Sequence, residues 1–128
     1  MKNLSNDKIS IQIADHGAEL VSIYANGTEY LWQADPQFWG RHSPVLFPIV
    51  GRVWNNTYRH KGQTYSLGQH GFARDMDLQL TYEEENAAIY TLESNEETMK
   101  VYPFPFVLEI GYRLKGLSLI HISEPTRL

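Results

Sequence analysis

Apolar and polar residues alternate along much of this chain, and that period of two is the spacing of a half-buried strand. Ile9, Ile11 and Ile13 are separated by Ser10 and Gln12, and residues 107–114 alternate in the same way. No stretch of about a dozen residues repeats its apolar positions with the 3.6 period of a helix. The sequence therefore predicts an all-β, antiparallel domain, with a sandwich favoured over a closed barrel.

Turn residues divide the alternating pattern into strands. Asn26-Gly27 is typical of a tight hairpin because both residues tolerate a positive φ, and Lys61-Gly62 predicts a second one. A short helical turn is expected at residues 95–98. Strands are expected at residues 9–13, 19–24, 29–33, near 58, 64–67, 78–82, 87–92 and 107–114.

Composition narrows the classes of function. The net charge of −4, without a basic run, argues against a nucleic-acid or anionic-membrane partner. The sequence has no cysteine, which removes disulfides, thiolate metal sites and cysteine nucleophiles and fits a reducing compartment. Neither a signal peptide nor an apolar run of membrane-spanning length is recognisable. We expect a cytoplasmic protein of one domain.

Residues 34–54 form an irregular, strongly apolar segment interrupted by proline and glycine. Such a segment is expected to pack down on the domain, and packed irregular segments often carry sites. Within this segment Arg52 ends the apolar run of residues 43–51, and it could present its guanidinium to ligand oxygens or merely leave the core. Trp39 could stack on a sugar ring, whereas Trp32 is expected in the core.

His70 and Arg74 lie four residues apart in a glycine-containing loop. An imidazole exchanges protons near neutral pH, and a guanidinium is a permanent multidentate donor, so the pair suits a ligand rich in hydroxyl or phosphate oxygens. The alternative is an ordinary surface histidine beside a solvated arginine. Asp75 and Asp77 alternate on one strand face and are either a carboxylate pair or, more simply, solvated charges.

Several common chemistries have no support in the sequence. It has no Gly-x-Ser-x-Gly elbow, no P-loop and no Gly-x-Gly-x-x-Gly motif. The five histidines are scattered, and no two have the spacing of metal ligands. No metal or cofactor is expected.

Seven short segments, in order, carry a family resemblance that covers residues from about 9 to 115. They are residues 17–20, 22–23, 29–32, 44–52, 65–67, 70–74 and 102–104. Together they resemble the N-terminal half of the galactose mutarotase-like (aldose 1-epimerase) family, particularly its bacterial LacX-type branch. The resemblance implies an antiparallel β-supersandwich, here an incomplete N-terminal half, which binds a hexose and interconverts its α and β anomers by acid–base ring opening.

The resemblance also assigns roles to single residues. His70 corresponds to a catalytic family histidine that hydrogen-bonds the sugar and stabilises charge at its ring oxygen, and Arg52 to an arginine that contacts sugar hydroxyls. Arg74 corresponds to a phosphate-holding arginine of the hexose-6-phosphate mutarotases. The family's acid histidine and base glutamate fall beyond this sequence, since neither His121 nor Glu124 matches their motifs. The chain is therefore expected to be inactive on its own.

Residues 1–116 are expected to be the N-terminal part of the epimerase-like domain. Residues 117–128 do not resemble the family and look like a translated sequencing adaptor, so this tail is expected to be artificial. Three alternatives stay open: a hexose-6-phosphate mutarotase, a non-catalytic carbohydrate-binding module, and a small β-domain for protein contacts. In the first two the partner is a small-molecule sugar; the oligomeric state is left open.

Overall fold

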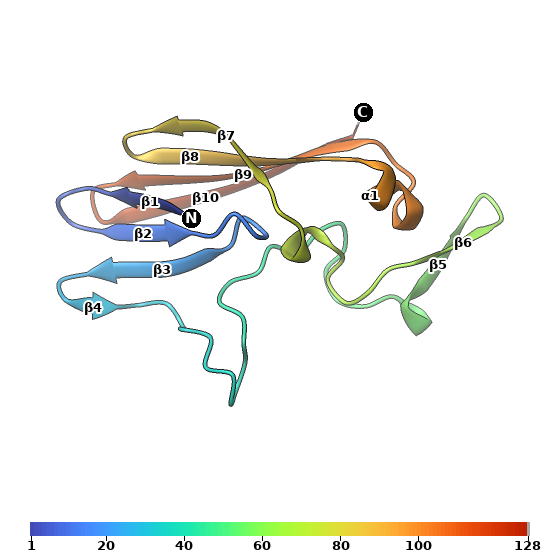
Figure 1. The fold of residues 1–128 in the computed structure, drawn as a ribbon, viewed down its shortest axis with the longest axis horizontal. Helices are drawn as coiled ribbons and strands as arrows, with labels where there is room; N and C mark the ends of the chain where they lie inside the picture. Colours follow the sequence, from blue (N-terminus) through green and yellow to red (C-terminus); the bar gives the residue numbers. More distant parts are fainter. Residues whose placement is uncertain (128) are drawn as a thin grey trace.

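The computed structural model describes residues 1–127, which form two four-stranded antiparallel sheets and a separate hairpin (Figure 1). The first sheet has the order β1 (Lys2–Ser5), β2 (Ser10–Ile13), β3 (Leu20–Ala25), β4 (Thr28–Glu29). The second has the order β10 (Ser118–Arg127), β9 (Phe106–Lys115), β8 (Ala87–Glu93), β7 (Gln79–Glu84). The hairpin pairs β5 (Thr57–His60) with β6 (Gln63–Ser66). The helical elements are the 3-10 turns η1 (Trp54–Asn56) and η2 (Ala73–Asp75) and the helix α1 (Glu96–Val101).

The core lies between the two sheets, because each contributes the buried half of its alternating residues. In β9, for example, every second side chain from Phe106 to Leu114 is buried and those between them are more exposed. Buried residues of both sheets belong to one cluster; its larger members include Leu4, Ile11, Ile13, Leu20, Tyr90, Leu92, Phe106, Leu108, Ile110, Tyr112 and Leu114. The predicted all-β antiparallel class is confirmed.

Two buried tyrosines connect the sheets through their hydroxyl groups. Tyr112 of β9 donates to the Ala18 carbonyl at 2.7 Å, and Tyr90 of β8 donates to Asp15 Oδ1 at 3.0 Å. Burial, reinforced by neighbouring carboxylates, raises the pKa of both phenols, so each hydroxyl stays protonated and remains a donor. These bonds hold the turn before β3 against the second sheet.

The local turn signals are confirmed. Asn26 and Gly27 adopt positive φ values of 51° and 76° between β3 and β4, and Lys61-Gly62 connects β5 to β6 in the same way. The expected helical turn is the start of α1. Asn95 caps it by accepting the Thr98 amide, and the Thr98 hydroxyl in turn accepts the Asn95 amide.

The structure differs from the sequence prediction at both ends of the first sheet. β1 was not expected, because Leu4 is the one buried residue in an otherwise polar stretch. The strand expected at residues 29–33 ends at Glu29, because the Leu31 amide donates to the Glu29 carboxylate at 3.0 Å and not to a neighbouring strand. Within the tail of residues 117–128, β10 pairs with β9; residue 128 lies outside the described residues. The tail's origin stays a prediction.

Glu29 makes a testable contribution to stability. Partial burial favours raising the pKa of its carboxyl, but hydrogen bonds from the Ser22 hydroxyl and three backbone amides outweigh burial and lower that pKa. A lowered pKa in the folded state means that the contribution is present above the ordinary value of 4.5 and is lost as the pH falls through the folded value. We expect Glu29→Gln to reduce the free energy of unfolding by about 1 kcal/mol at neutral pH.

Urea unfolding at neutral pH and at about pH 3 checks this expectation. The cost of Glu29→Gln should shrink at the lower pH. Glu85→Gln, in the exposed turn between β7 and β8, is the matched control and should cost little at either pH. An equal cost of Glu29→Gln at both pH values would contradict the assigned cause.

Candidate functional site

Two irregular segments, residues 47–52 and 69–75, lie side by side and carry three of the four predicted site residues. The Phe47 carbonyl accepts the amides of Phe72 and Ala73 at 2.9 and 3.2 Å, and the Gly51 carbonyl accepts the His70 amide at 2.7 Å. The two loops are thus joined at both ends by backbone hydrogen bonds. This pairing positions the side chains that follow more firmly than either loop could alone.

Close packing underneath the loops depends on Gly71. Its φ is +73°, and a Cβ there would lie 2.2 Å from the Phe47 carbonyl oxygen. Phe47 and Phe72 pack edge to face with ring centres 6.1 Å apart, and both rings also contact Phe106 of β9. The loops therefore stand directly on the core at the end of the second sheet.

The half-buried imidazole of His70 is oriented by one backbone hydrogen bond. The Gly51 amide donates to His70 Nδ1 at 2.8 Å. Because Nδ1 acts as an acceptor, the neutral ring carries its proton on Nε2. His70 can therefore offer an N–H donor to an oxygen of a bound ligand.

Arg52 and Arg74 meet at Gln69, the residue before His70. Arg74 Nη2 donates to the Gln69 carbonyl at 2.9 Å, and Arg52 Nη2 lies 3.5 Å from Gln69 Oε1. Three of the four predicted site residues are thus connected within one small network. Two guanidinium groups and an imidazole N–H together form a set of donors that suits a ligand rich in oxygen atoms.

Trp39 lies in a different segment. In Figure 1, residues 34–46 form an extended loop that projects below the first sheet. The Trp39 carbonyl accepts Trp32 Nε1 at 2.9 Å, and the Trp32 ring meets Phe38 edge to face. No contact found among residues 1–127 joins the Trp39 ring to His70, so its role as a stacking residue stays a prediction.

The expectation that residues 34–54 pack down on the domain holds only in part. Val45 is buried, but Phe38 is 77% exposed and Trp54 is 86% exposed, and Trp32, expected in the core, is exposed too. Local apolarity indicates a need for burial, but it does not say which side chains of an irregular segment reach the core.

Sequence reasoning missed two residues of the network, Gln69 and Arg41. Gln69 connects the two arginines, and Arg41 Nη2 donates to Asp75 Oδ1 at 2.9 Å. Asp75 and Asp77 do not form a carboxylate pair: Asp75 ends η2, while Asp77 hydrogen-bonds His16 Nδ1 at 2.9 Å. No local signal identifies Arg41, because its partner Asp75 lies 34 positions away in the sequence.

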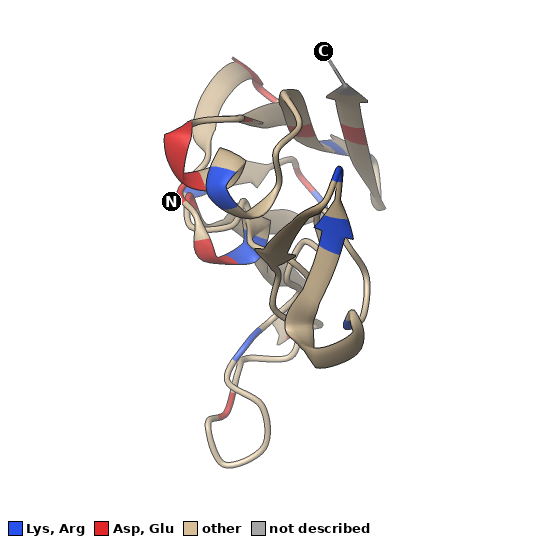
Figure 2. Ribbon diagram, turned by 90° about the vertical axis from the view of Figure 1, so that its right-hand side faces the viewer, with Lys and Arg blue, Asp and Glu red and all other residues tan. Residues whose placement is uncertain are grey.

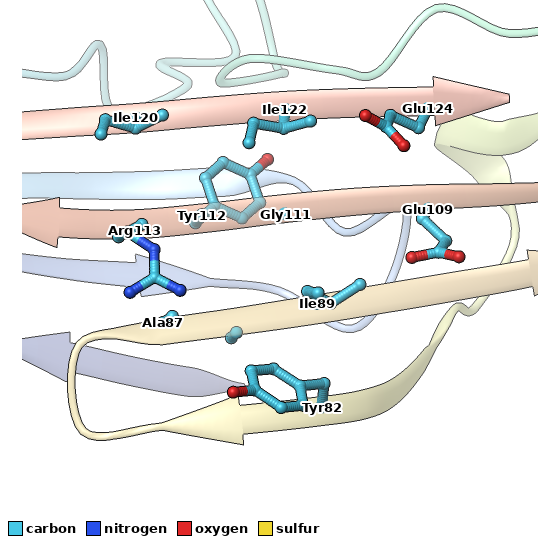
Figure 3. Close-up of a pocket in the computed structure, with 11 residues that line it drawn as sticks. Tyr82, Ala87, Ile89, Glu109, Gly111, Tyr112, Arg113, Ile120, Ile122 and Glu124 are labelled. Atoms are coloured by element: carbon cyan, nitrogen blue, oxygen red, sulfur yellow. The ribbon is translucent and has the colours of Figure 1, made fainter.

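A hollow of the described surface lies elsewhere, on the second sheet. It has a volume of about 200 Å³ and spreads over β7, β8, β9 and β10, where Tyr82, Ile89, Ile120 and Ile122 line it (Figure 3). None of the four predicted site residues contributes to this hollow.

Charge and metal-binding groups do not single out another site. Acidic and basic segments of the ribbon are interspersed in Figure 2 and do not gather on one side. In the described part of the chain no three His, Cys, Asp or Glu side chains are placed to hold a metal ion. No helix in residues 1–127 is both long and apolar enough to cross a membrane.

Comparison with known proteins gives a consistent family assignment. The aldose 1-epimerase family profile matches residues 2–124. The chromosomal and plasmid LacX proteins of Lactococcus lactis subsp. lactis are each 35% identical to the chain, over 98% of its length and 44% of theirs. The chain thus spans less than half the length of these curated relatives.

Solved structures agree. A galactose mutarotase related enzyme from Lactobacillus acidophilus is 44% identical, with a TM-score of 0.97 over 98% of this chain and 43% of that one. A galactose mutarotase-like protein from Lactobacillus casei is 37% identical, with a TM-score of 0.95 over 99% of this chain and 44% of that one. The two sheets and the loops between them therefore follow a backbone arrangement seen in these proteins.

Proposed function

The chain belongs to the aldose 1-epimerase family, and from that premise we propose that it forms the N-terminal part of an isomerase that interconverts the α and β anomers of a hexose. The observation that carries the proposal is the donor set of His70, Arg52 and Arg74 around Gln69. An oxygen-rich, uncharged ligand such as a pyranose is recognised by several directed donors of this kind. Ring opening and closure break and re-form the bond between the anomeric carbon and the ring oxygen with transfer of protons and no net oxidation or reduction, so the proposal includes no cofactor.

In this mechanism ring opening needs a base at the anomeric hydroxyl and an acid at the ring oxygen. His70, with its proton on Nε2, would hydrogen-bond the sugar and stabilise charge that develops on the ring oxygen. Arg52 would hold sugar hydroxyls. We assign the proton-abstracting base to no residue of this sequence, and we therefore expect the 128-residue chain to leave the spontaneous rate of anomerisation unchanged.

The test separates binding from catalysis with a chimera, in which residues 1–116 of this chain precede the C-terminal part of the Lactobacillus acidophilus relative. Polarimetry of freshly dissolved α-D-galactose or α-D-glucose should show accelerated mutarotation with the chimera and the spontaneous rate with the 128-residue chain. Acceleration by the 128-residue chain would contradict our placement of the base. A chimera that folds and binds hexose without acceleration would favour a carbohydrate-binding module.

A hexose 6-phosphate is the second candidate substrate. The observation that favours it is the meeting of two guanidinium groups at Gln69, because paired arginines suit a phosphate. Within the resemblance, Met76-Asp77-Leu78 stands where a tryptophan is expected a few residues after the phosphate-type motif, which favours the free sugar. Comparing the chimera's rates with glucose and glucose 6-phosphate decides between them. A cytoplasmic location belongs to the same proposal and fits the cysteine-free sequence.

A further inference from the structure

The Asp75 carboxylate faces guanidinium groups from two different segments. Arg41, in the loop that follows β4, donates to Asp75 Oδ1 at 2.9 Å, and Arg74 Nε lies 3.8 Å from Asp75 Oδ2. Arg74 also donates to the Gln69 carbonyl. Arg52, Gln69, His70 and Arg74 are called the His70 network below, and residues 35–40 the aromatic loop. Asp75 is the one carboxylate, among the contacts described, that joins the end of the aromatic loop to the His70 network.

The aromatic loop, residues 35–40, and the residues just after it are also held by residues that flank the first sheet. Trp32, three residues after β4, donates through Nε1 to the Trp39 carbonyl, as described above. Just after the loop, the nearly buried carboxylate of Glu19, directly before β3, accepts the amides of His42 and Ser43 at 2.7 and 2.9 Å. These bonds fix the backbone on either side of Arg41. The ion pair between Arg41 and Asp75 connects this stretch of chain to η2.

The exposure of the Arg41–Asp75 ion pair indicates that its role is to orient side chains and not to stabilise the fold. The Arg41 and Asp75 side chains are 34% and 52% exposed, and an ion pair with such access to water contributes little to stability. Loss of the pair should therefore leave the fold intact. The geometric consequence is larger. The Asp75 carboxylate accepts a hydrogen bond from Arg41, and it is also the charged group beside Arg74 Nε, a buried N–H that has no hydrogen-bond partner among the described residues.

We propose that Asp75 is a positioning residue: through Arg41 it holds the aromatic loop beside the His70 network, and through Arg74 it orients a guanidinium group of the ligand site. The inference rests on the proposed function only in naming a hexose as the ligand. It assigns Asp75 no contact with the sugar. Its effect reaches the ligand through Trp39 and Arg74.

The experiment uses the 128-residue chain and the variants Asp75→Asn, Arg41→Gln and the double variant. Nitrogen–proton spectra report the indole N–H of Trp39, assigned with Trp39→Phe, and the Nε–H of Arg74. Both single variants should shift the Trp39 signal, and the double variant should shift it no further, because either change alone breaks the Arg41–Asp75 pair. Asp75→Asn should also shift the Arg74 signal, and the double variant should shift that signal no further than Asp75→Asn does. Arg41→Lys, which keeps the charge, should restore part of the wild-type Trp39 position.

Asp77→Asn is the matched control, because Asp77 is an exposed carboxylate two residues away that pairs with His16. It should leave both signals unchanged. A Trp39 signal that stays at its wild-type position in Asp75→Asn and Arg41→Gln, an Arg74 signal that stays there in Asp75→Asn, or shifts that add in the double variant, would overturn the inference. Since the pair is largely exposed, melting temperatures should stay close to wild type in all variants.

Titration with galactose gives the functional readout. We expect Asp75→Asn to weaken hexose binding about 5- to 10-fold, in the range that misplaced positioning groups usually cost, and Asp77→Asn to leave binding unchanged. A wild-type chain that binds no hexose would count against the proposed function, while the Trp39 and Arg74 signals would still decide the positioning role. Undiminished binding by Asp75→Asn would overturn the link from positioning to ligand.

Discussion

Gly71→Ala is expected to lower the free energy of unfolding by about 3 kcal/mol or more, enough to remove a large share of the stability of a small domain. Two effects add. The residue has a φ of +73°, which costs an L-residue about 1–2 kcal/mol. The new methyl would also lie 2.2 Å from the Phe47 carbonyl oxygen and 2.6 Å from Pro48 Cδ, so the paired loops would have to separate.

Gly62→Ala separates these two effects. Gly62, in the hairpin between β5 and β6, has a similar φ of +78°, but a Cβ there meets no atom within 4 Å. It should show only the backbone cost of about 1–2 kcal/mol. Urea unfolding followed by circular dichroism measures both variants. Equal costs for Gly71→Ala and Gly62→Ala would show that the loops give way without penalty.

The features that could be predicted from the sequence are those set by neighbouring residues. Alternation along β9, the Asn26-Gly27 turn and the Asn95 cap each depend on a few consecutive positions, and each is confirmed. β1 and the early end of β4 depend instead on which strand or side chain takes a backbone amide. Local pattern does not contain that information.

The candidate site also contains some residues that the local sequence identifies and others that it does not. His70 and Arg74 share one loop, so their proximity follows from the chain itself. Arg52 was identified by its position after an apolar run, and the family resemblance added its role. The pairing of Arg41 with Asp75 joins residues 34 positions apart. Nothing local to either residue distinguishes it from an ordinary surface charge. They meet only because the fold places the loop after β4 next to η2, and that placement depends on the folded sheets.

His70→Asn is the second variant for which we expect a large effect. In the chimera we expect it to slow hexose mutarotation by about 100- to 10,000-fold, the usual range for a lost acid–base or charge-stabilising group. Asparagine tolerates the positive φ of 62° at this position better than other non-glycine residues. Its side-chain oxygen can accept the Gly51 amide as His70 Nδ1 does, so the loops should remain paired.

What asparagine lacks is a donor at the position of Nε2, because its side chain ends where the imidazole Nδ1 lies. His70→Gln makes the opposite exchange: its amide can reach towards the Nε2 position but leaves the Gly51 amide without its acceptor. We therefore expect His70→Asn to fold like wild type with little activity, and His70→Gln to be less stable with more residual activity. Polarimetry and urea unfolding on the same samples test both halves. A fully active, stable His70→Asn chimera would remove His70 from the chemistry and return it to a role in loop structure.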